Sequence, residues 1–397
     1  MSNIINDLYK ALENQTEICF GELTGELGWE LSIISPIIKL FKKDHPDKKV
    51  VVLTRDDRKE LYENSGIDDI FCFNITGDYK TKTPRTNGLY ETPENLATHQ
   101  VNPVDHNKLF SKARQTILNK YPNIKFFSFN NLPFMPNPQF DFSQFNYDFK
   151  PNPINSEIIN NIIFKNPERQ VITIFSRHRV DLVHRNWTES NWKELYKRLN
   201  EMNYTIFISG KSPSYIKPLK KYTNMFILEN LAENYNKSSI LGLTIEAVRN
   251  SKFCFGPQTA GILLSNFMRI PNIYFGKEEV LVSQKYNPYK TPYYFLNANY
   301  SSNYEYIISV NDVINGIKAF DNNLNNKIYN DSNFKFTDIN SSNNQTNKEI
   351  VFKHPTIHPA LVGLKGDELL DKIREINNNP HHYKPKLEST VIAKNKV

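Results

Sequence analysis

The sequence has few cysteines and no long apolar run. Cys19, Cys72 and Cys254 are the three cysteines in 397 residues, and each lies within an apolar, strand-like segment. Thiols in such segments are typical of small buried residues in a reducing compartment rather than of disulfide or metal partners. No run approaches the roughly 20 apolar residues of a membrane helix, and the polar start does not resemble a signal peptide. We therefore expect a cytoplasmic protein without a transmembrane segment, for which peripheral membrane contact stays open.

The chain also lacks an excess of one charge and a metal-binding pattern. It has 49 Lys and Arg against 42 Asp and Glu, a net charge of +7, and the two signs are interleaved. This pattern disfavours a nucleic-acid binder, which usually groups its basic residues. His354, His358, His381 and His382 lie in the last part of the chain without a cysteine or carboxylate cluster at ligand spacing. We expect no metal and no cofactor.

Common nucleotide and hydrolase signatures are missing as well. The chain has no Gly-x-x-x-x-Gly-Lys-Ser/Thr loop, no Gly-x-Ser-x-Gly elbow and no Gly-x-Gly-x-x-Gly after a strand. These absences argue against a P-loop NTPase, an α/β hydrolase and an ordinary NAD-dependent dehydrogenase. An Asp-x-Asp motif, which a metal-dependent nucleotide-sugar site would need, is also absent.

The chain does contain two series of alternating strand-like and helix-like segments. Hydrophobic content of 39% and aromatic content of 13% suffice for real cores. The expected strands are 16–21, 50–53, 70–73, 125–129, 171–175, 205–209, 225–228, 253–255, 273–275 and 291–296. The expected helices are 29–43, 56–64, 108–120, 189–199, 215–221, 240–249, 310–320 and, in the tail, 367–377. Such alternation predicts parallel sheets covered by helices, hence an α/β fold of two Rossmann-like domains facing across a cleft.

Three segments without clear periodicity interrupt these series. The polar stretch 77–100 is expected to be a long surface loop. A region rich in Pro and Asn, from Pro133 to Pro153, is expected to link the two domains. The Asn- and Ser-rich stretch 331–348 is expected to be a flexible linker.

A turn after the strand at 253–255 could hold an anion. The apolar run stops at Gly256-Pro257, and a turn of small residues then opens a helix-like run. Free backbone N–H groups at a helix N-terminus suit a phosphate. The alternative is an ordinary βαβ crossover without a ligand. The candidate contacts are Gln258, Thr259, Ala260 and Gly261.

Residues after other strands could complete this site, because ligands of open α/β sheets bind at the carboxyl ends of the strands. Guanidinium groups are suited to bidentate phosphate contacts, although a solvated basic loop is the alternative. The further candidates are Arg177, Arg179 and Arg185 after the strand at 171–175, Lys211 after the strand at 205–209, and Glu246 on helix 240–249. Glu246 could reach a ribose hydroxyl, or it could be an ordinary surface position.

Acidic residues follow the first strand. Glu22, Glu26 and Glu30 surround Gly25 and Gly28 in a glycine-rich turn. A carboxylate there could act as general base on an acceptor hydroxyl. Alternatively, acidic residues in the first turn of a helix merely complement its dipole.

Three stretches resemble GT-B glycosyltransferases, in particular the heptosyltransferase-like group. The first is Gly25-Glu-Leu-Gly-Trp-Glu-Leu-Ser-Ile-Ile-Ser-Pro36, followed by His45-Pro-Asp-Lys-Lys-Val-Val-Val-Leu53. The second is Arg185-Asn-Trp187 followed by Trp192-Lys-Glu-Leu195, and the third is the stretch 251–276. The resemblance covers roughly residues 16–320.

The match at the acidic turn has two possible registers. Counting back from Pro36 places Glu30 where the family has its catalytic Asp, with Trp29 as one inserted residue. Counting from Gly28 instead makes Glu26 the alternative candidate for the position of the catalytic Asp.

The third stretch departs from the family pattern at its polar positions. Gln258 stands where the family has Asp, Ala260 where it has Gly, and Leu263 near its His. The backbone amides of a phosphate-binding turn would survive these changes, so a donor other than ADP-heptose is expected.

The resemblance implies a metal-independent, inverting glycosyltransferase of hexosyl or heptosyl type, with a nucleotide-sugar donor and a glycan or other hydroxyl acceptor. It implies an acceptor-binding domain at 1–150 and a nucleotide-sugar-binding domain at 151–325, followed by a flexible linker and tail at 326–397. The alternatives are a nucleotide-sugar 2-epimerase and a non-catalytic GT-B-like protein that binds glycans or partners.

Overall fold

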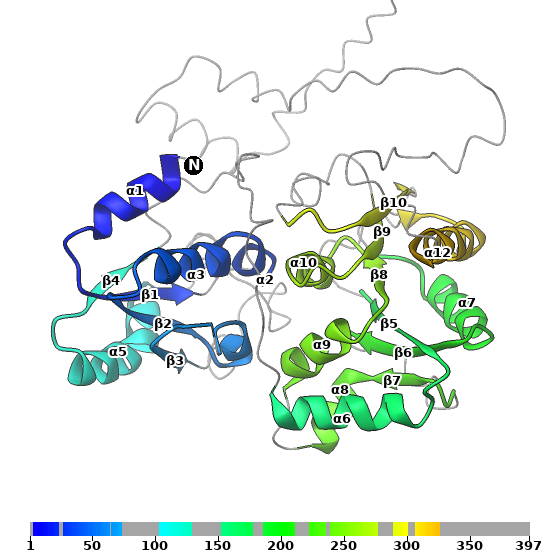
Figure 1. Ribbon diagram of the computed structural model, residues 1–397, viewed down its shortest axis with the longest axis horizontal. Helices are drawn as coiled ribbons and strands as arrows, with labels where there is room; N and C mark the ends of the chain where they lie inside the picture. The colour runs from blue at the N-terminus through cyan, green and yellow to red at the C-terminus, as the bar shows by residue number, and fades with distance from the viewer. Residues whose placement is uncertain are drawn as a thin grey trace, which may run out of the picture. The chain divides into compact units, whose positions relative to one another are not determined.

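The computed structural model describes residues 3–23, 27–63, 65–73, 103–128, 152–177, 186–210, 222–235, 239–276, 289–300 and 306–325 (Figure 1). The chain divides into two compact units, Met1–Ile339 and Asn340–Val397, and every described residue belongs to the first. The loop expected at 77–100, the helices expected at 215–221 and 367–377, and the linker expected at 331–348 lie outside the described residues.

The first half of the described chain forms a parallel sheet of four strands. In space the strands follow the order β3-β2-β1-β4, and each neighbouring pair is parallel. The strands are β1 (Glu17–Leu23), β2 (Lys49–Arg55), β3 (Asp69–Phe73) and β4 (Lys125–Phe127). The helical segments are α1 (Asn3–Leu12), α2 (Leu27–Trp29), the π-helix η1 (Glu30–Ile34), α3 (Ser35–Asp44), the 3₁₀-helix η2 (Asp56–Leu61) and α5 (Pro103–Lys120).

The second half forms a parallel sheet of six strands in the order β10-β9-β8-β5-β6-β7. The strands are β5 (Gln170–Phe175), β6 (Tyr204–Ser209), β7 (Met225–Ile227), β8 (Phe253–Pro257), β9 (Asn272–Gly276) and β10 (Tyr293–Asn297). A small antiparallel pair, β11 (Asn299–Tyr300) and β12 (Tyr306–Ile307), follows the sheet. The helices are α6 (Pro153–Phe164), α7 (Glu189–Asn200), α8 (Leu228–Asn234), α9 (Ile240–Arg249), α10 (Ala260–Phe267) and α12 (Val310–Asn325).

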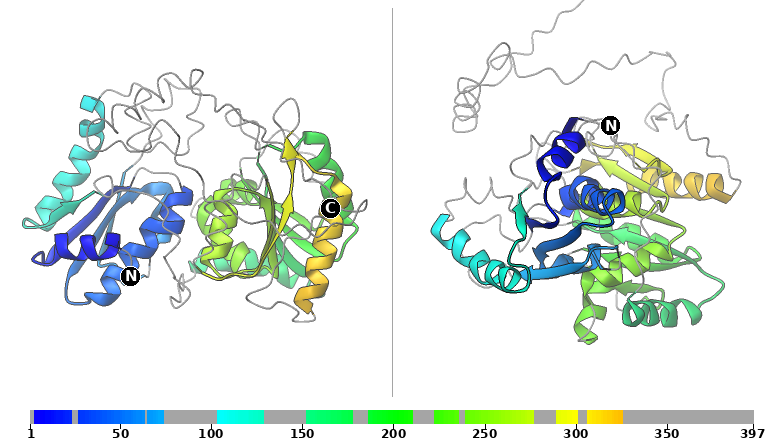
Figure 2. Two further views of the ribbon diagram at one scale, coloured as in Figure 1. Left: turned by 90° about the horizontal axis from the view of Figure 1, so that it is seen from above. Right: turned by 60° about the vertical axis from the view of Figure 1, so that its left-hand side comes forward.

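Side-chain alternation along the strands sends successive residues of the second sheet to opposite faces. Ile172 and Ile174 of β5 join the apolar cluster that includes α7 and α12. Phe175 joins a different cluster, which contains residues of α9 and α10. Figures 1 and 2 accordingly show α7 and α12 on one face of this sheet and α9 and α10 on the other. Burial on both faces explains why these strands read as continuous apolar runs.

This architecture confirms the predicted α/β class with two Rossmann-like halves. The structure differs from the expectations in local elements. The segment expected as a helix at 56–64 is the 3₁₀-helix η2. Helix α6, which begins at Pro153 where the expected linker ends, was not among the expected helices. Proline is tolerated there since a first-turn N–H has no intrahelical partner, and Asn152 caps the helix by accepting from the Ile154 N–H at 3.0 Å.

Within the described ranges, every helix is too short or too polar to cross a membrane.

Candidate functional site

The second sheet has a topological switch point between β5 and β8. The chain passes from β5 to β6 on one side and later places β8 on the other side of β5. Because connections leave in opposite directions at such a point, the carboxyl ends of the two strands border a crevice that suits a ligand. The residues after β5 and after β8 are therefore the first to consider.

The turn after β8 presents an uncapped helix N-terminus. Thr259 is the N-cap residue of α10 and makes no side-chain hydrogen bond to the helix. Among the described residues, its buried Oγ1 has no hydrogen-bond partner. The first N–H groups of a helix have no intrahelical acceptor, so Ala260 and Gly261 can offer theirs to an anion. The strand, turn and helix expected here are thus present, and phosphate binding by the turn stays a prediction.

Gly261 lets the helix start close to the end of β5. A Cβ atom at this position would come within 3.0 Å of three ring atoms of Phe175. Since real Cβ atoms essentially never approach so closely, any larger residue would push the turn away from the sheet. Gly261 therefore has a packing reason in addition to its predicted donor contact.

The Gln258 side chain points into the protein interior. Its side chain is completely buried and lies against Gly276, where an added Cβ would overlap the Gln258 amide. Its Oε1 accepts a hydrogen bond from the Tyr306 hydroxyl at 3.1 Å, and its backbone N–H donates to the Phe275 carbonyl at 3.1 Å. These contacts favour a role in holding the turn rather than in touching a donor.

The residues after β5 bring a guanidinium to the same edge. The Ser176 N–H donates to the Ser209 carbonyl at 2.9 Å, which aligns the ends of β5 and β6. Gly210, with φ of 119°, allows this approach, because a Cβ there would overlap the Ser176 carbonyl. Arg177 follows directly and is 6% exposed. Arg179, Arg185 and Lys211 lie outside the described residues.

Glu246 lies on α9, three residues before the helix ends and leads into β8. The amino end of β8 is opposite the edge where Thr259 and Arg177 lie. The Glu246 carboxylate accepts from the Ser156 hydroxyl at 2.8 Å and from Arg249 at 2.6 Å. These contacts favour packing between α6 and α9, and the structure does not bring Glu246 to the other candidates.

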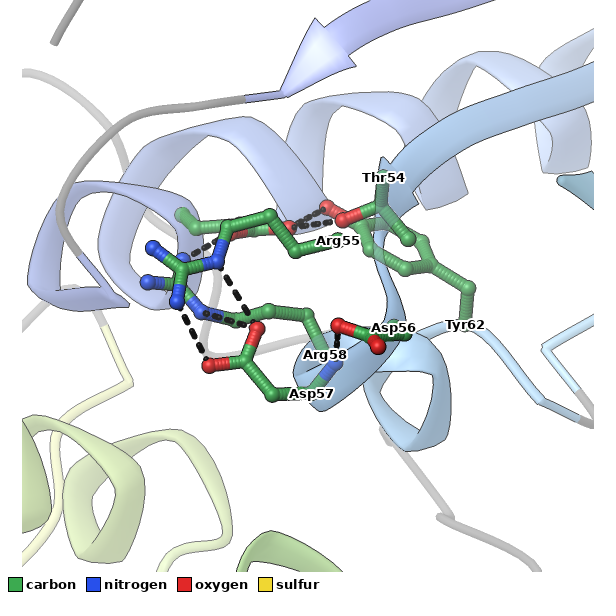
Figure 3. A network of polar contacts seen from close by, with 7 residues as sticks. Thr54, Arg55, Asp56, Asp57, Arg58 and Tyr62 are labelled. Atoms are coloured by element: carbon green, nitrogen blue, oxygen red, sulfur yellow. Dashed lines mark hydrogen bonds and ion pairs between the residues drawn. The ribbon is translucent and has the colours of Figure 1, made fainter. Parts of the chain in front are cut away.

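Glu30 lies in a buried polar network of the first half (Figure 3). It is 1% exposed. Its Oε1 accepts from the Thr54 hydroxyl at 3.0 Å and from the Tyr62 hydroxyl at 2.8 Å. Its Oε2 forms an ion pair with Arg58. Both oxygens are therefore occupied by donors from β2 and the turn that follows it.

Two arginines and three acidic residues, Glu30, Asp56 and Asp57, belong to this network. Arg55 donates to both carboxylate oxygens of Asp57, at 2.8 and 2.7 Å, and Arg58 lies between Asp57 and Glu30. Figure 3 shows the two arginine side chains extending side by side toward Asp57. Burial, and then the Glu30 carboxylate, raise the pKa of Tyr62 well above its usual value, so its hydroxyl stays a donor. Two guanidinium groups thus face two carboxylates.

The alternative acid, Glu26, follows the first strand of the first sheet. Glu26 and the side chain of Glu22 lie outside the described residues. In the chain, Glu26 comes three residues after the end of β1, and the switch point of the first sheet lies between β1 and β4. Among the described residues, no group of three or more His, Cys, Asp or Glu side chains could hold a metal ion.

Several residues of these sites escaped sequence reasoning. Arg58 and Tyr62 are spaced four apart, which could have suggested a shared helical face, but nothing paired them with Glu30. Tyr306 carries no recognisable signal, because it lies in a two-residue strand.

Two parallel sheets, each with its own switch point and helices, define an α/β protein with two Rossmann-like halves. No protein-family model matches the chain, and no curated protein matches it.

The chain is similar to several solved glycosyltransferases at low sequence identity. A glycosyl transferase family 9 protein from Veillonella parvula has a TM-score of 0.49 at 11% identity, over 77% of this chain and 97% of that one. ADP-heptose LPS heptosyltransferase II of E. coli has a TM-score of 0.48 at 10% identity, over 79% and 100%. Heptosyltransferase WaaC of E. coli, solved with ADP, has a TM-score of 0.42 at 12% identity, over 77% and 98%. At these identities the similarity is one of fold.

Proposed function

We propose that the chain is a glycosyltransferase that moves a sugar from a nucleotide-sugar donor to a hydroxyl acceptor without a metal. One observation carries the proposal. An uncapped helix N-terminus at Thr259 and a guanidinium at Arg177 follow the two neighbouring strands of the switch point in the second sheet. Backbone amides and a guanidinium together match the charge and geometry of a diphosphate.

In the proposed reaction, a carboxylate takes the proton of the acceptor hydroxyl. The acceptor oxygen attacks the anomeric carbon, the bond from that carbon to the phosphate oxygen breaks, and its electron pair leaves with the nucleoside diphosphate. The amides of Thr259 to Gly261 and Arg177, joined by Arg179, Arg185 or Lys211, stabilise the departing charge. Attack from the opposite face inverts the anomeric configuration.

We assign the proton transfer to Glu26 in preference to Glu30. The Glu30 carboxylate is 1% exposed and already accepts from Thr54, Tyr62 and Arg58, so an acceptor hydroxyl could reach it only if the surrounding side chains moved. Glu26 follows β1, whose carboxyl end borders the switch point of the first sheet. In this assignment Glu30 has a structural role, because its contacts hold the start of η1 in place.

A ligand screen tests donor binding. UDP-, GDP-, ADP- and CMP-sugars are added at increasing concentrations, and the melting temperature is followed, since a ligand of the folded state stabilises it by mass action. We expect one nucleotide class to raise the melting temperature, and Arg177→Gln to weaken that shift. Arg198→Gln, at a partly exposed position on α7, is the matched control and should leave it unchanged. No shift with any donor would contradict the proposal.

A transfer assay then tests the base. With the donor found in the screen, Glu26→Gln should abolish transfer while donor binding persists. If Glu26→Gln and Glu30→Gln both leave transfer unchanged, neither carboxylate is the base.

The engagement of Glu30 supports one alternative from another class. A GT-B-like protein that binds glycans or partners without catalysis has no need of a free carboxylate after β1. Such a protein would show neither nucleotide binding nor donor hydrolysis.

A further inference from the structure

The short hairpin of β11 and β12 reaches the turn that opens α10. Tyr306 of β12 is 1% exposed, and its ring packs edge-on against Phe275 with the ring centroids 5.8 Å apart. Its hydroxyl donates to Gln258 Oε1 at 3.1 Å. Gln258 is the residue directly before the N-cap Thr259, so the hairpin contacts the residue from which the predicted phosphate turn begins.

The same hairpin also holds the segment that follows the predicted arginines. The backbone N–H of Tyr306 donates to the Asn186 carbonyl at 2.9 Å. Nearby, the indole N–H of Trp187 donates to the Ile308 carbonyl at 3.0 Å. Asn186 comes directly after Arg185 in the chain. Tyr306 therefore bonds to both stretches that the proposed function assigns to the donor, through its hydroxyl to one and through its amide to the other.

We infer that Tyr306 is a positioning residue for the donor phosphates, coupling the turn at Gln258–Gly261 to Asn186. The assignment to phosphates rests on the proposed function, whereas the coupling of the two stretches rests on the contacts alone. The Tyr306 hydroxyl holds the Gln258 side chain against Gly276 and so fixes the direction of the amides that follow. Gln258 acts through the turn and touches no ligand.

The hydroxyl is the part of Tyr306 that packing does not explain. The ring alone would fill the space beside Phe275, and a phenylalanine would fill it equally well. A buried hydroxyl instead requires a partner, and here the partner is the amide that anchors the turn. Tyr306→Phe thus removes the hydrogen bond to Gln258 and keeps both the ring packing and the backbone bond to Asn186.

Tyr204 provides a matched control in the same apolar cluster. It is 5% exposed, and its hydroxyl bonds to Asp321. It begins β6, at the amino edge of the sheet, opposite the turn. Tyr204→Phe therefore also deletes one buried hydroxyl, at a place that does not touch the proposed donor site.

The first experiment uses no ligand. Amide hydrogen exchange of the full-length protein is compared for the wild type, Tyr306→Phe and Tyr204→Phe. We expect Tyr306→Phe to raise the exchange rate of peptides covering 258–262 and residue 306, whose N–H donates to Asn186, together by about three- to tenfold, the effect of one lost hydrogen bond. Tyr204→Phe should raise neither. Unchanged exchange at either segment in Tyr306→Phe would overturn the coupling.

The second experiment measures binding of UDP, GDP, ADP and CMP and of the matching nucleosides. For the nucleotide that binds, Tyr306→Phe should raise the dissociation constant by roughly three- to tenfold, and Tyr204→Phe should not. Equal weakening by the two variants would overturn the positioning role. If no nucleotide binds the wild type while the exchange result holds, the proposed function and the phosphate role fall, and the coupling of the two stretches stands.

Discussion

At the scale of single residues, Glu30 shows how a buried charge is kept. Taking a carboxylate and a guanidinium out of water costs several kcal/mol per ion, about what their mutual attraction returns. Here Thr54 and Tyr62 supply further hydrogen bonds to the same carboxylate. Removing one partner of such a pair is therefore far more damaging than its net contribution suggests.

Glu30→Gln should destabilise the protein by about 3 kcal/mol, because it leaves the buried Arg58 charge with less compensation. The measurement is the free energy of unfolding from urea titration. Glu63→Gln is the control, since its ion pair with Lys59 is partly exposed and joins residues four apart, and such pairs contribute about 0.5 kcal/mol or less. Equal losses in the two variants would contradict the structural role of Glu30.

The sequence indicated an acidic residue of interest at this position but not its partners. Thr54, Arg58 and Tyr62 are 24, 28 and 32 residues away. They reach Glu30 because β1 and β2 pair in parallel and the segments that follow both strands meet at one edge. No local pattern encodes such a meeting, so neighbouring residues could suggest a base and could not show that donors already occupy it.

At the scale of elements, α10 depends on its close approach to β5. Gly261→Ala would place a methyl group inside the Phe175 ring. We expect a loss of about 1–3 kcal/mol in stability, the usual effect of overpacking, together with weaker nucleotide binding as the turn moves. Chemical denaturation and the ligand screen measure the two effects.

A double variant separates the overlap from other effects of the alanine. Phe175→Leu should make room, so that adding Gly261→Ala to it costs less than adding it to the wild type. Strict additivity of the two changes would rule out the Phe175 ring as the cause.

Elements differed in how far the sequence predicted them. Parallel strands buried on both faces are dense in Val, Ile and Phe, so β2, β5 and β6 were found closely. Helix α6 was not predicted because the prolines up to Pro153 suggested a linker, although Pro153 occupies a first-turn position where proline is tolerated. The π-helix η1 was not predicted, although counting back from Pro36 in the comparison with the family gave Trp29 as one inserted residue.

At the scale of the whole molecule, one apolar cluster contains side chains from both sheets. It includes Phe20, Leu31 and Phe41 of the first half with Phe175, Ile262 and Phe267 of the second. Lys39 of α3 lies at this shared core, with its Nζ 5.0 Å from the centre of the Phe267 ring. Burial lowers the pKa of Lys39 from 10.5 to about 7.

Lys39 should make the stability of the folded protein rise with pH. Between pH 7 and 10.5 the unfolded chain carries this proton and the folded chain has lost it, so the free energy of unfolding increases with pH. The slope from one group approaches about 1.4 kcal/mol per pH unit. Urea titrations at pH 6.5 and 8.5 should show Lys39→Met more stable than the wild type at the lower pH, with the gap narrowing at the higher.

Lys43→Met is the matched control, because Lys43 lies one turn further along α3 and is exposed. It should change the stability equally at both pH values. A constant gap between Lys39→Met and the wild type would show that Lys39 keeps its proton in the folded protein.

The alternation of strands and helices was enough to predict both sheets, because each parallel strand needs a crossover that returns the chain to the same edge. The shared core was not predictable in the same way. Leu31 and Phe267 each belong to an ordinary amphipathic pattern, and neither pattern indicates which residue of the other half it will contact.

The π-helix at Glu30–Ile34 has a consequence for how chains of different length can be compared. A π turn accommodates one residue more than an α-helix of the same rise. Deleting Trp29 would let the run regain α spacing, and each residue before the deletion would rotate by about 100° relative to Ile37 and Ile38, which the core holds in place. A relative that is one residue shorter here would thus keep the residue in place of Glu30 beside Arg58 and turn the residues on the glycine side in a new direction. Aligning such chains from the proline side and from the glycine side would place different residues opposite Glu30, and both alignments would be locally correct.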